Sequence, residues 1–163
     1  MFLGEKCPEC AGSNRIVFNF VFWKIKLNKL TLKYELDLDF VLIAITSSLK
    51  DYMLCFKLNK ELKINFHKVD EHHIETNSAN LYFSKFYYQV SESETDFYLL
   101  ANRANPGYLI PEMNKVDYFF IIKNYISEEE VEQLIEGINK VPEVLAAIEV
   151  EPRKLKSKEN LIF

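Results

Sequence analysis

The stretch Val116–Val150, VDYFFIIKNYISEEEVEQLIEGINKVPEVLAAIEV, decides the fold. It begins with an apolar strand over Val116–Lys123 and ends with a second strand over Val144–Val150, which Pro152 stops. Between the strands, apolar side chains recur at the spacing of an amphipathic helix, namely Val131, Leu134, Ile135 and Ile138. The stretch therefore predicts a β-α-β unit.

Two capping boxes predict where the helices begin. Ser127 and Glu130 have the S-x-x-E spacing, and Ser48 and Asp51 have the related S-x-x-D spacing. The helix that follows Ser48 is expected to run to about Leu62 with one apolar stripe, formed by Leu54, Cys55, Leu58 and Leu62.

The earlier part of the chain also reads as strands around a helix. Phe40–Ile45 is a continuous apolar run of the kind buried on both faces of a sheet, and Ile64–Val69 alternates apolar and polar residues. Leu81–Val90 and Phe97–Asn102 are two further strands, joined by the acidic loop Ser91–Asp96. This gives a second β-α-β unit and a hairpin.

The predicted fold class is α+β. Two β-α-β units flank a β-hairpin, and right-handed crossovers place both helices on one face of a mixed or antiparallel sheet. This arrangement has ferredoxin-like or ACT-like character, in pattern and not in any specific motif.

The chain divides into a core domain and two flanking segments. Residues 1–24 are interpreted as an N-terminal tail, residues 25–152 as a single α+β domain, and residues 153–163 as a basic, then apolar, C-terminal tail. The segment Ile16–Tyr34 has strand character. Alternation of Leu155 with lysines leaves open whether the C-terminal tail docks on a partner or on its own core.

The composition excludes several classes of protein. The 163 residues carry a net charge of −4 and are 48% hydrophobic and 14% aromatic, with few glycines and prolines. Disorder and low-complexity repeats are excluded, and a general, charge-driven nucleic-acid binder is not expected. The odd cysteine count and the absence of a 20-residue apolar run predict a cytoplasmic protein with no membrane association.

The segment Ile110–Tyr118, IPEMNKVDY, fits all six named positions of the pattern that names the IPExxxVDY family of Bacteroidetes-type bacterial proteins. Lys50-Asp51-Tyr52 and the closing Leu155–Phe163 also resemble that family, over roughly Leu30 to Phe163. The resemblance implies a cytoplasmic bacterial protein. It implies no activity, and no catalytic residue is carried over from it.

Two groups could suggest a metal site. Cys7-Pro8-Glu9-Cys10 is one C-x-x-C pair without the second pair that a structural zinc site needs. His72 and His73 are adjacent, so in a strand their side chains point to opposite faces, and a solvated polar loop is the preferred interpretation. We expect no metal and no cofactor.

The candidate binding residues surround the loop after Phe97–Asn102. Glu112 and Asp117 form the best carboxylate pair, and Arg103, Asn105 and Tyr118 lie close to them in the sequence. Such a cluster could be an acid–base pair or a small-molecule clamp.

A structural interpretation of the same cluster stays open. Glu112 could accept hydrogen bonds from turn backbone groups or pair with Lys115, and Asp117 could accept one from Arg103. In that case the carboxylates stabilise loops and do no chemistry.

Three functions follow, in order of preference. The first is a non-enzymatic ligand-binding or protein-interaction module, expected to be a homo-oligomer, because the aromatic strand Leu81–Val90 is apolar on both faces. The second is a small enzyme that uses Glu112 and Asp117. The third is RNA binding through the strand aromatics, which the acidic loop Ser91–Asp96 disfavours.

Overall fold

The computed structural model describes residues 38–75 and 80–163. The described residues belong to one compact unit, Glu35–Phe163. The predictions for the tail 1–24, for the strand Ile16–Tyr34 and for Cys7 and Cys10 lie outside the described residues.

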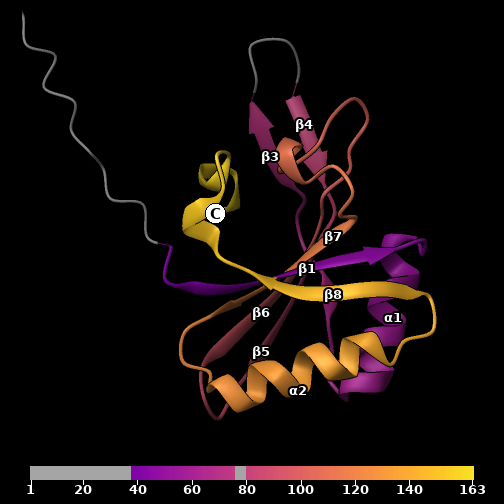
Figure 1. Ribbon diagram of the computed structural model, residues 1–163, viewed down its shortest axis with the longest axis vertical. Coiled ribbons are helices and arrows are strands. Elements are labelled where there is room, and N and C mark those ends of the chain that lie inside the picture. Colours follow the sequence, from indigo (N-terminus) through magenta and orange to yellow (C-terminus); the bar gives the residue numbers. More distant parts are fainter. Residues whose placement is uncertain (1–37, 76–79) are drawn as a thin grey trace, which may run out of the picture. The chain divides into compact units, whose positions relative to one another are not determined.

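Six strands form one antiparallel sheet in the order β2-β5-β6-β7-β1-β8 (Figure 1). The bounds of the elements are β1 Phe40–Ser47, α1 Asp51–Leu62, β2 His67–Lys68, β5 Lys85–Val90, β6 Thr95–Ala101, β7 Tyr118–Lys123, α2 Glu128–Asn139 and β8 Val144–Val150. A separate two-stranded sheet pairs β3, His72–Glu75, with β4, Asn80–Phe83. The α+β prediction is confirmed, whereas the ferredoxin-like or ACT-like character stays a prediction.

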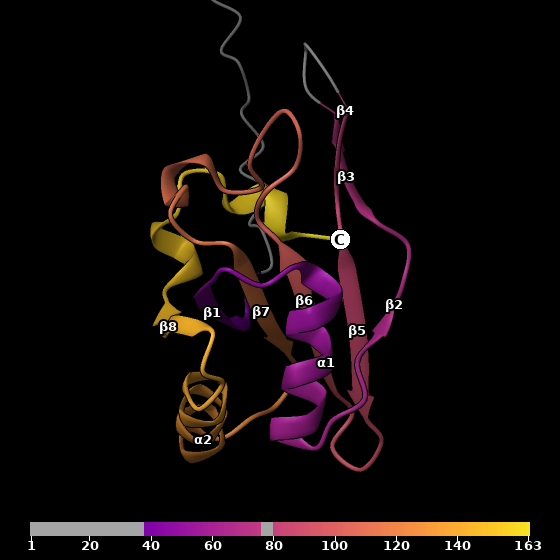
Figure 2. The same ribbon diagram turned by 90° about the vertical axis from the view of Figure 1, so that its right-hand side faces the viewer.

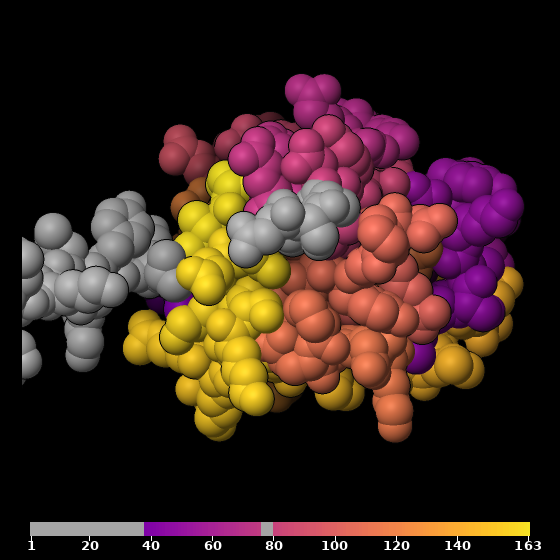
Figure 3. Space-filling model, turned by 90° about the horizontal axis from the view of Figure 1, so that it is seen from above, coloured from indigo at the N-terminus to yellow at the C-terminus, as the bar shows by residue number. Residues whose placement is uncertain are grey.

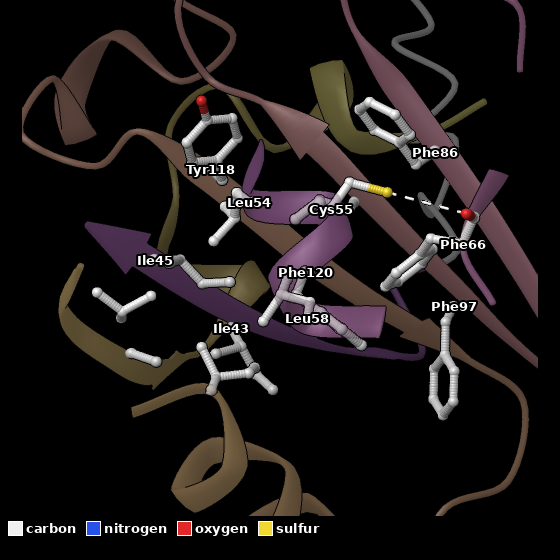
Figure 4. Close-up of a cluster of buried hydrophobic side chains, with 14 of the residues drawn as sticks. Ile43, Ile45, Leu54, Cys55, Leu58, Phe66, Phe86, Phe97, Tyr118 and Phe120 are labelled. Atoms are coloured by element: carbon white, nitrogen blue, oxygen red, sulfur yellow. Dashed lines mark hydrogen bonds between the residues drawn. The ribbon is translucent and has the colours of Figure 1, made fainter. Parts of the chain in front are cut away.

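Both helices cover one face of the sheet, as predicted (Figure 2). The buried side chains Leu54 and Leu58 of α1 and Ile138 of α2 join one core cluster with alternate residues of the central strands (Figure 4). Because successive strand residues point to opposite faces, Ile43 enters this helix-side core while Leu42 enters a second core on the other face.

The second core lies under segments without long helices. Leu109, Ile110 and Val116 come from the connection between β6 and β7, which includes the short helix η1, Pro111–Met113. Leu155 and Leu161 come from the C-terminal tail, which contains the short helices η2, Pro152–Lys154, and η3, Lys158–Leu161. Figure 3 shows the tail packed against this connection. The tail therefore docks on its own domain.

One capping box is confirmed and the other prediction is wrong. Ser127 accepts a hydrogen bond from the backbone N–H of Glu130, and the Glu130 carboxylate accepts one from the backbone N–H of Ser127. Helix α1 begins at Asp51, two residues later than a cap at Ser48 predicts, and its N-cap residue is Lys50, without any side-chain cap. Ser48 lies two residues before the N-cap position, because the chain bends at Ser48 and Leu49 after β1 ends, and Lys50 is still extended.

Two strand predictions need correction. Of Ile64–Val69 only His67–Lys68 pairs with β5, because the Asn59 side chain bonds both backbone groups of Phe66. The predicted strand Leu81–Val90 breaks at Ser84 into β4 and β5, which belong to different sheets.

The prediction of a solvated polar loop at the histidine pair is also wrong. His72 and His73 lie in β3 and not in a solvated loop. Their side chains do point to opposite faces, since His72 is buried and His73 is exposed. None of the described helices has the length and apolar composition of a membrane-spanning segment.

Candidate functional site

Three of the five predicted site residues line one polar cleft of about 440 Å³. In this cleft Arg103, Asp117 and Tyr118 lie beside the segment that joins β1 to α1. The full lining is Ser47, Ser48, Leu49, Lys50, Asp51, Ser84, Ala101, Arg103, Asp117 and Tyr118. Glu112 and Asn105 do not line it.

Asp117 organises the cleft from the start of β7. One carboxylate oxygen accepts the backbone N–H of Ser47 at 2.9 Å, which fixes the end of β1. The other oxygen lies 2.8 Å from Nε of Arg103. The Asp117 side chain is only 16% exposed, so the guanidinium is oriented by a partner that is largely shielded from solvent.

Arg103 is the more exposed partner of that pair. Its side chain is 56% exposed and lines the cleft. Because Nε makes the ion pair, the two terminal nitrogens keep donors that a carboxylate or phosphate can accept in a two-point arrangement.

Tyr118 holds the other end of the β1–α1 connection. Its hydroxyl donates to the carbonyl oxygen of Leu49 at 2.6 Å. Burial, with the nearby charges of Asp51 and Asp117, raises the pKa of Tyr118 to about 12, against the lowering effect of Arg103. The phenol is therefore protonated at neutral pH and acts here as a structural donor.

The first turn of α1 adds positive potential to the cleft. The aligned peptide dipoles place partial positive charge at this end of the helix, and no side chain caps it. Asp51 contributes an opposing charge, but its carboxylate already accepts the backbone N–H of Tyr52 at 2.8 Å. Lys50, exposed, makes no ion pair among the described residues.

Glu112 has a different task, because it clasps the C-terminal tail. Its Oε1 accepts the backbone N–H groups of Lys156 and Ser157 at 2.6 and 2.8 Å, and its Oε2 accepts the hydroxyl of Ser157 at 3.0 Å. Burial raises the pKa of Glu112, but these hydrogen bonds outweigh it and the pKa is lowered. The sequence pointed to the right residue and to its role as a hydrogen-bond acceptor, but not to the donors in the tail, which are 44 and 45 positions away.

Asn102 is the residue whose role the sequence did not reveal. It is fully buried at the end of β6. Its amide nitrogen donates to the carbonyls of Met113 and Val116, and its amide oxygen accepts the N–H of Ile110. One side chain thus fixes the loop that carries both Glu112 and Asp117.

Asn105 lies at the tip of a tight turn, outside the cleft. Ala104 and Gly107 exchange two backbone hydrogen bonds of 2.8 and 2.7 Å across the turn, and Asn105 is exposed. No hydrogen bond from its side chain joins it to the other candidate residues in the described part of the chain.

Cys55, the third cysteine, is a core residue. It is buried on α1, and its thiol contacts the carbonyl oxygen of Phe66 at 3.8 Å (Figure 4). Burial, and then the charge of Asp51, raise the pKa of Cys55 to about 11, so it is no thiolate ligand or nucleophile at neutral pH. The described residues contain no group of three or more His, Cys, Asp or Glu side chains placed to hold a metal ion.

The aromatic strands are largely covered. Phe83, Phe86 and Phe97 are buried, and the ring of Tyr98 packs against that of Phe163 at 4.9 Å between centroids. The tail thus covers part of the second apolar face, so that face is no longer a reason to expect a second subunit. Base stacking needs open ring faces, and among these aromatics only Tyr82 is an exposed large side chain.

A second hollow of about 450 Å³ has a different character. It lies between the β5–β6 hairpin and the start of α2, with mainly apolar residues such as Val90, Phe97 and Leu134. It carries Glu130 but no lysine or arginine. Its lining therefore offers no cationic side chain for an anionic ligand.

No family model matches the chain, and no curated protein matches it. The resemblance to the IPExxxVDY family therefore stays a prediction.

Proposed function

We propose that the chain is a non-enzymatic binding module whose polar cleft takes a small ligand with a carboxylate or phosphate group. The observation that carries the proposal is Arg103, which is held by Asp117 through Nε and remains 56% exposed inside the cleft. A pre-oriented guanidinium loses little freedom on binding an anion.

The surroundings of Arg103 support an anionic ligand. Lys50 and the uncapped first turn of α1 add positive potential, and Ser48 and Ser84 add hydroxyl groups that can donate. Of the two carboxylates, Asp51 is bonded to a backbone N–H and Asp117 to Ser47 and Arg103. Both acids are thus already engaged.

The enzyme alternative has less support. It needs Glu112 and Asp117 to converge, but Glu112 binds the tail and Asp117 binds the β1–α1 connection. In the described part of the chain, the cleft contains no histidine or cysteine to serve as base or nucleophile.

We also propose membership of the IPExxxVDY family, supported by a structural role for the motif positions. Ile110 and Val116 are buried, Pro111 begins η1, and Glu112, Asp117 and Tyr118 make the contacts described above. A cytoplasmic location is proposed on the same resemblance, and the free, buried Cys55 is consistent with it.

The test is a titration of the full chain with inorganic phosphate and with acetate, followed by backbone amide chemical shifts. We expect shifts at Ser48, Lys50, Asp51 and Ser84, and their loss in Arg103→Ala. Arg153→Ala is the matched control, since Arg153 is exposed outside the cleft and should leave the shifts unchanged. Shifts that are absent from these amides, or that survive in Arg103→Ala, would overturn the proposal.

A further inference from the structure

We propose that the second hollow, between the β5–β6 hairpin and the start of α2, binds an organic cation, namely a protonated primary amine that carries a short apolar chain. The hairpin and the start of α2 meet at one end of the sheet (Figure 1). The second hollow shares no lining residue with the polar cleft. This site therefore goes beyond the proposed function and does not depend on it.

The second hollow has the volume and the apolar walls for the chain of such a ligand. Its volume of about 450 Å³ lies in the usual range of small-ligand sites, roughly 300–1,000 Å³. Phe97 belongs to the helix-side core, and four partly buried residues of the lining pack against that core, namely Leu62, Val90, Ile126 and Leu134. An apolar chain in the hollow would cover these side chains further, which is favourable.

The hydroxyl groups of the lining that are fixed by hydrogen bonds can only accept a further one from a ligand. Buried Thr95 donates its single hydroxyl hydrogen to the carbonyl oxygen of Tyr125 at 2.8 Å. Oγ of Ser93 lies 2.7 Å from Oγ1 of Thr95, so Ser93 is the donor of that hydrogen bond. Both hydroxyl hydrogens are then used, and the Ser93 oxygen keeps lone pairs. A ligand must therefore supply the donor.

Glu130 adds a carboxylate with one unused oxygen to the same lining. Its Oε2 accepts the backbone N–H and the hydroxyl of Ser127, both at 2.9 Å. These hydrogen bonds lower the pKa of Glu130, so the carboxylate is charged at neutral pH. Its Oε1 has no hydrogen-bond or ion-pair partner among the described residues. An ammonium group supplies both the donors and the opposite charge that this lining lacks.

The charges around the second hollow also favour a cation. The first turn of α2 carries Glu128, Glu129 and Glu130, whose combined charge exceeds the partial positive charge of the helix end. The turn of the β5–β6 hairpin adds the exposed Glu92 and Glu94. No lysine or arginine of the described chain belongs to the lining. An anionic ligand would therefore be repelled.

The two remaining polar side chains of the lining are compatible with an ammonium group. Tyr125 and Gln133 are exposed, and no hydrogen bond holds either side chain in the described part of the chain. The face of the Tyr125 ring attracts cations, and the amide oxygen of Gln133 can accept a hydrogen bond.

The first experiment titrates the full chain at pH 7 with hexylammonium, 1-hexanol and hexanoate, which carry similar apolar chains, and follows backbone amide chemical shifts. We expect saturable shifts at Thr95, Phe97, Ile126 and Leu134. Hexylammonium should bind at least about fivefold more tightly than 1-hexanol, and hexanoate should bind most weakly. Butylammonium should bind at least about threefold more weakly than hexylammonium, because it buries two fewer methylene groups.

Two results of this titration would overturn the proposal at once. One is the absence of saturable shifts at these four amides. The other is an affinity for hexanoate, 1-hexanol or butylammonium that equals the affinity for hexylammonium.

The second experiment removes the charge of Glu130 and keeps the helix cap. Glu130→Gln retains an acceptor for the backbone N–H of Ser127, because glutamine also serves in a capping box. We expect it to weaken hexylammonium binding by about fivefold and to leave 1-hexanol binding within about twofold. Glu129→Gln is the matched control, since Glu129 lies in the same turn but outside the lining, and it should change neither affinity by more than about twofold.

Two further variants test the donor requirement and the independence of the two sites. Ser93→Ala, at the exposed hairpin turn, should weaken hexylammonium binding by about threefold. Arg103→Ala, in the polar cleft, should leave hexylammonium binding unchanged, whether or not the cleft binds anions. Thermal unfolding followed by circular dichroism checks that each variant remains folded. Equal losses in Glu130→Gln and Glu129→Gln, or a loss in Arg103→Ala, would overturn the proposal.

Discussion

The polar cleft and the contact of Glu112 with Lys156 and Ser157, here called the tail clasp, each depend on one carboxylate. The two carboxylates are five positions apart in the sequence, but they have different roles. Asp117 lies in the cleft and orients Arg103, which stays exposed to solvent. The carboxylate of Glu112 accepts hydrogen bonds from three donors of the tail. The difference shows that the same chemistry, a carboxylate accepting hydrogen bonds, orients an exposed side chain in one place and fastens a chain segment in the other.

The largest expected effect comes from the support that both regions share. Asn102→Ala removes three hydrogen bonds and takes their partner from the buried N–H of Ile110 and the buried carbonyl of Val116, while the Met113 carbonyl keeps the N–H of Val116. We expect the free energy of unfolding to fall by about 3 kcal/mol in urea titrations. Asn105→Ala, at the exposed turn tip, is the control and should change it by less than about 0.5 kcal/mol. Equal effects of the two substitutions would show that the loop is not held by Asn102.

Glu112→Ala should separate the two regions. The substitution removes the group that accepts three hydrogen bonds from the tail, at an exposed site. We therefore expect the free energy of unfolding to fall by about 1.5 kcal/mol. Hydrogen exchange should become faster at Lys156 and Ser157, while the amides of Ser47 and Leu49 in the cleft keep their protection. Glu92→Ala, on the exposed β5–β6 turn, is the matched acidic control. Faster exchange in both regions would contradict their separation.

Two serines that each lie three positions before an acidic residue should also differ in their contribution to stability. Ser127 caps α2, so Ser127→Ala is expected to cost about 1 kcal/mol of stability. Ser48 lines the cleft and does not cap α1, so Ser48→Ala should leave the unfolding midpoint in urea unchanged. A clear loss of stability in Ser48→Ala would instead indicate that Ser48 supports the start of α1.

The smallest expected effect is a pH dependence of stability, which arises where β3 contacts the C-terminal tail. Nε2 of His72 lies 2.9 Å from the carbonyl oxygen of Asn160 in the tail. Burial lowers the pKa of His72 below 6.5, although the hydrogen bond to Asn160 opposes this. The unfolded chain then binds the proton more readily, so stability should fall as the pH drops from about 6.5 through the folded pKa.

Urea unfolding between pH 7 and pH 5 measures this dependence. We expect the slope of stability against pH to be steeper in the wild type than in His72→Gln, which has no imidazole to titrate. His73→Gln, at the exposed neighbour, is the control. Identical slopes in the wild type and His72→Gln would contradict the assignment.

The part of the fold that local pattern encodes could be predicted. The stripe and capping box of α2 need only residues three or four positions apart, and both were found. Long-range polar contacts could not be predicted in this way. Glu112 meets Lys156 across 44 positions and His72 meets Asn160 across 88, with no periodicity to announce either contact.

The candidate site was predictable in the same measure. The ion pair between Arg103 and Asp117 was one of the alternatives considered from the sequence, and the structure confirms it. The participation of Lys50 and Ser84 was not foreseen, because the fold brings the start of α1 and the β4–β5 junction to the end of β6. Glu112 was grouped with Asp117 because they are close in sequence, although their side chains serve different segments.

The most direct test of the account compares phosphate binding by three full-length proteins: the wild type, Arg103→Ala and Glu112→Ala. If the cleft is the ligand site and the clasp only holds the tail, Arg103→Ala should weaken the affinity by about tenfold or more. Glu112→Ala should then retain the wild-type affinity within about twofold, despite its lower stability. Equal loss in both variants, or loss in Glu112→Ala alone, would contradict the account.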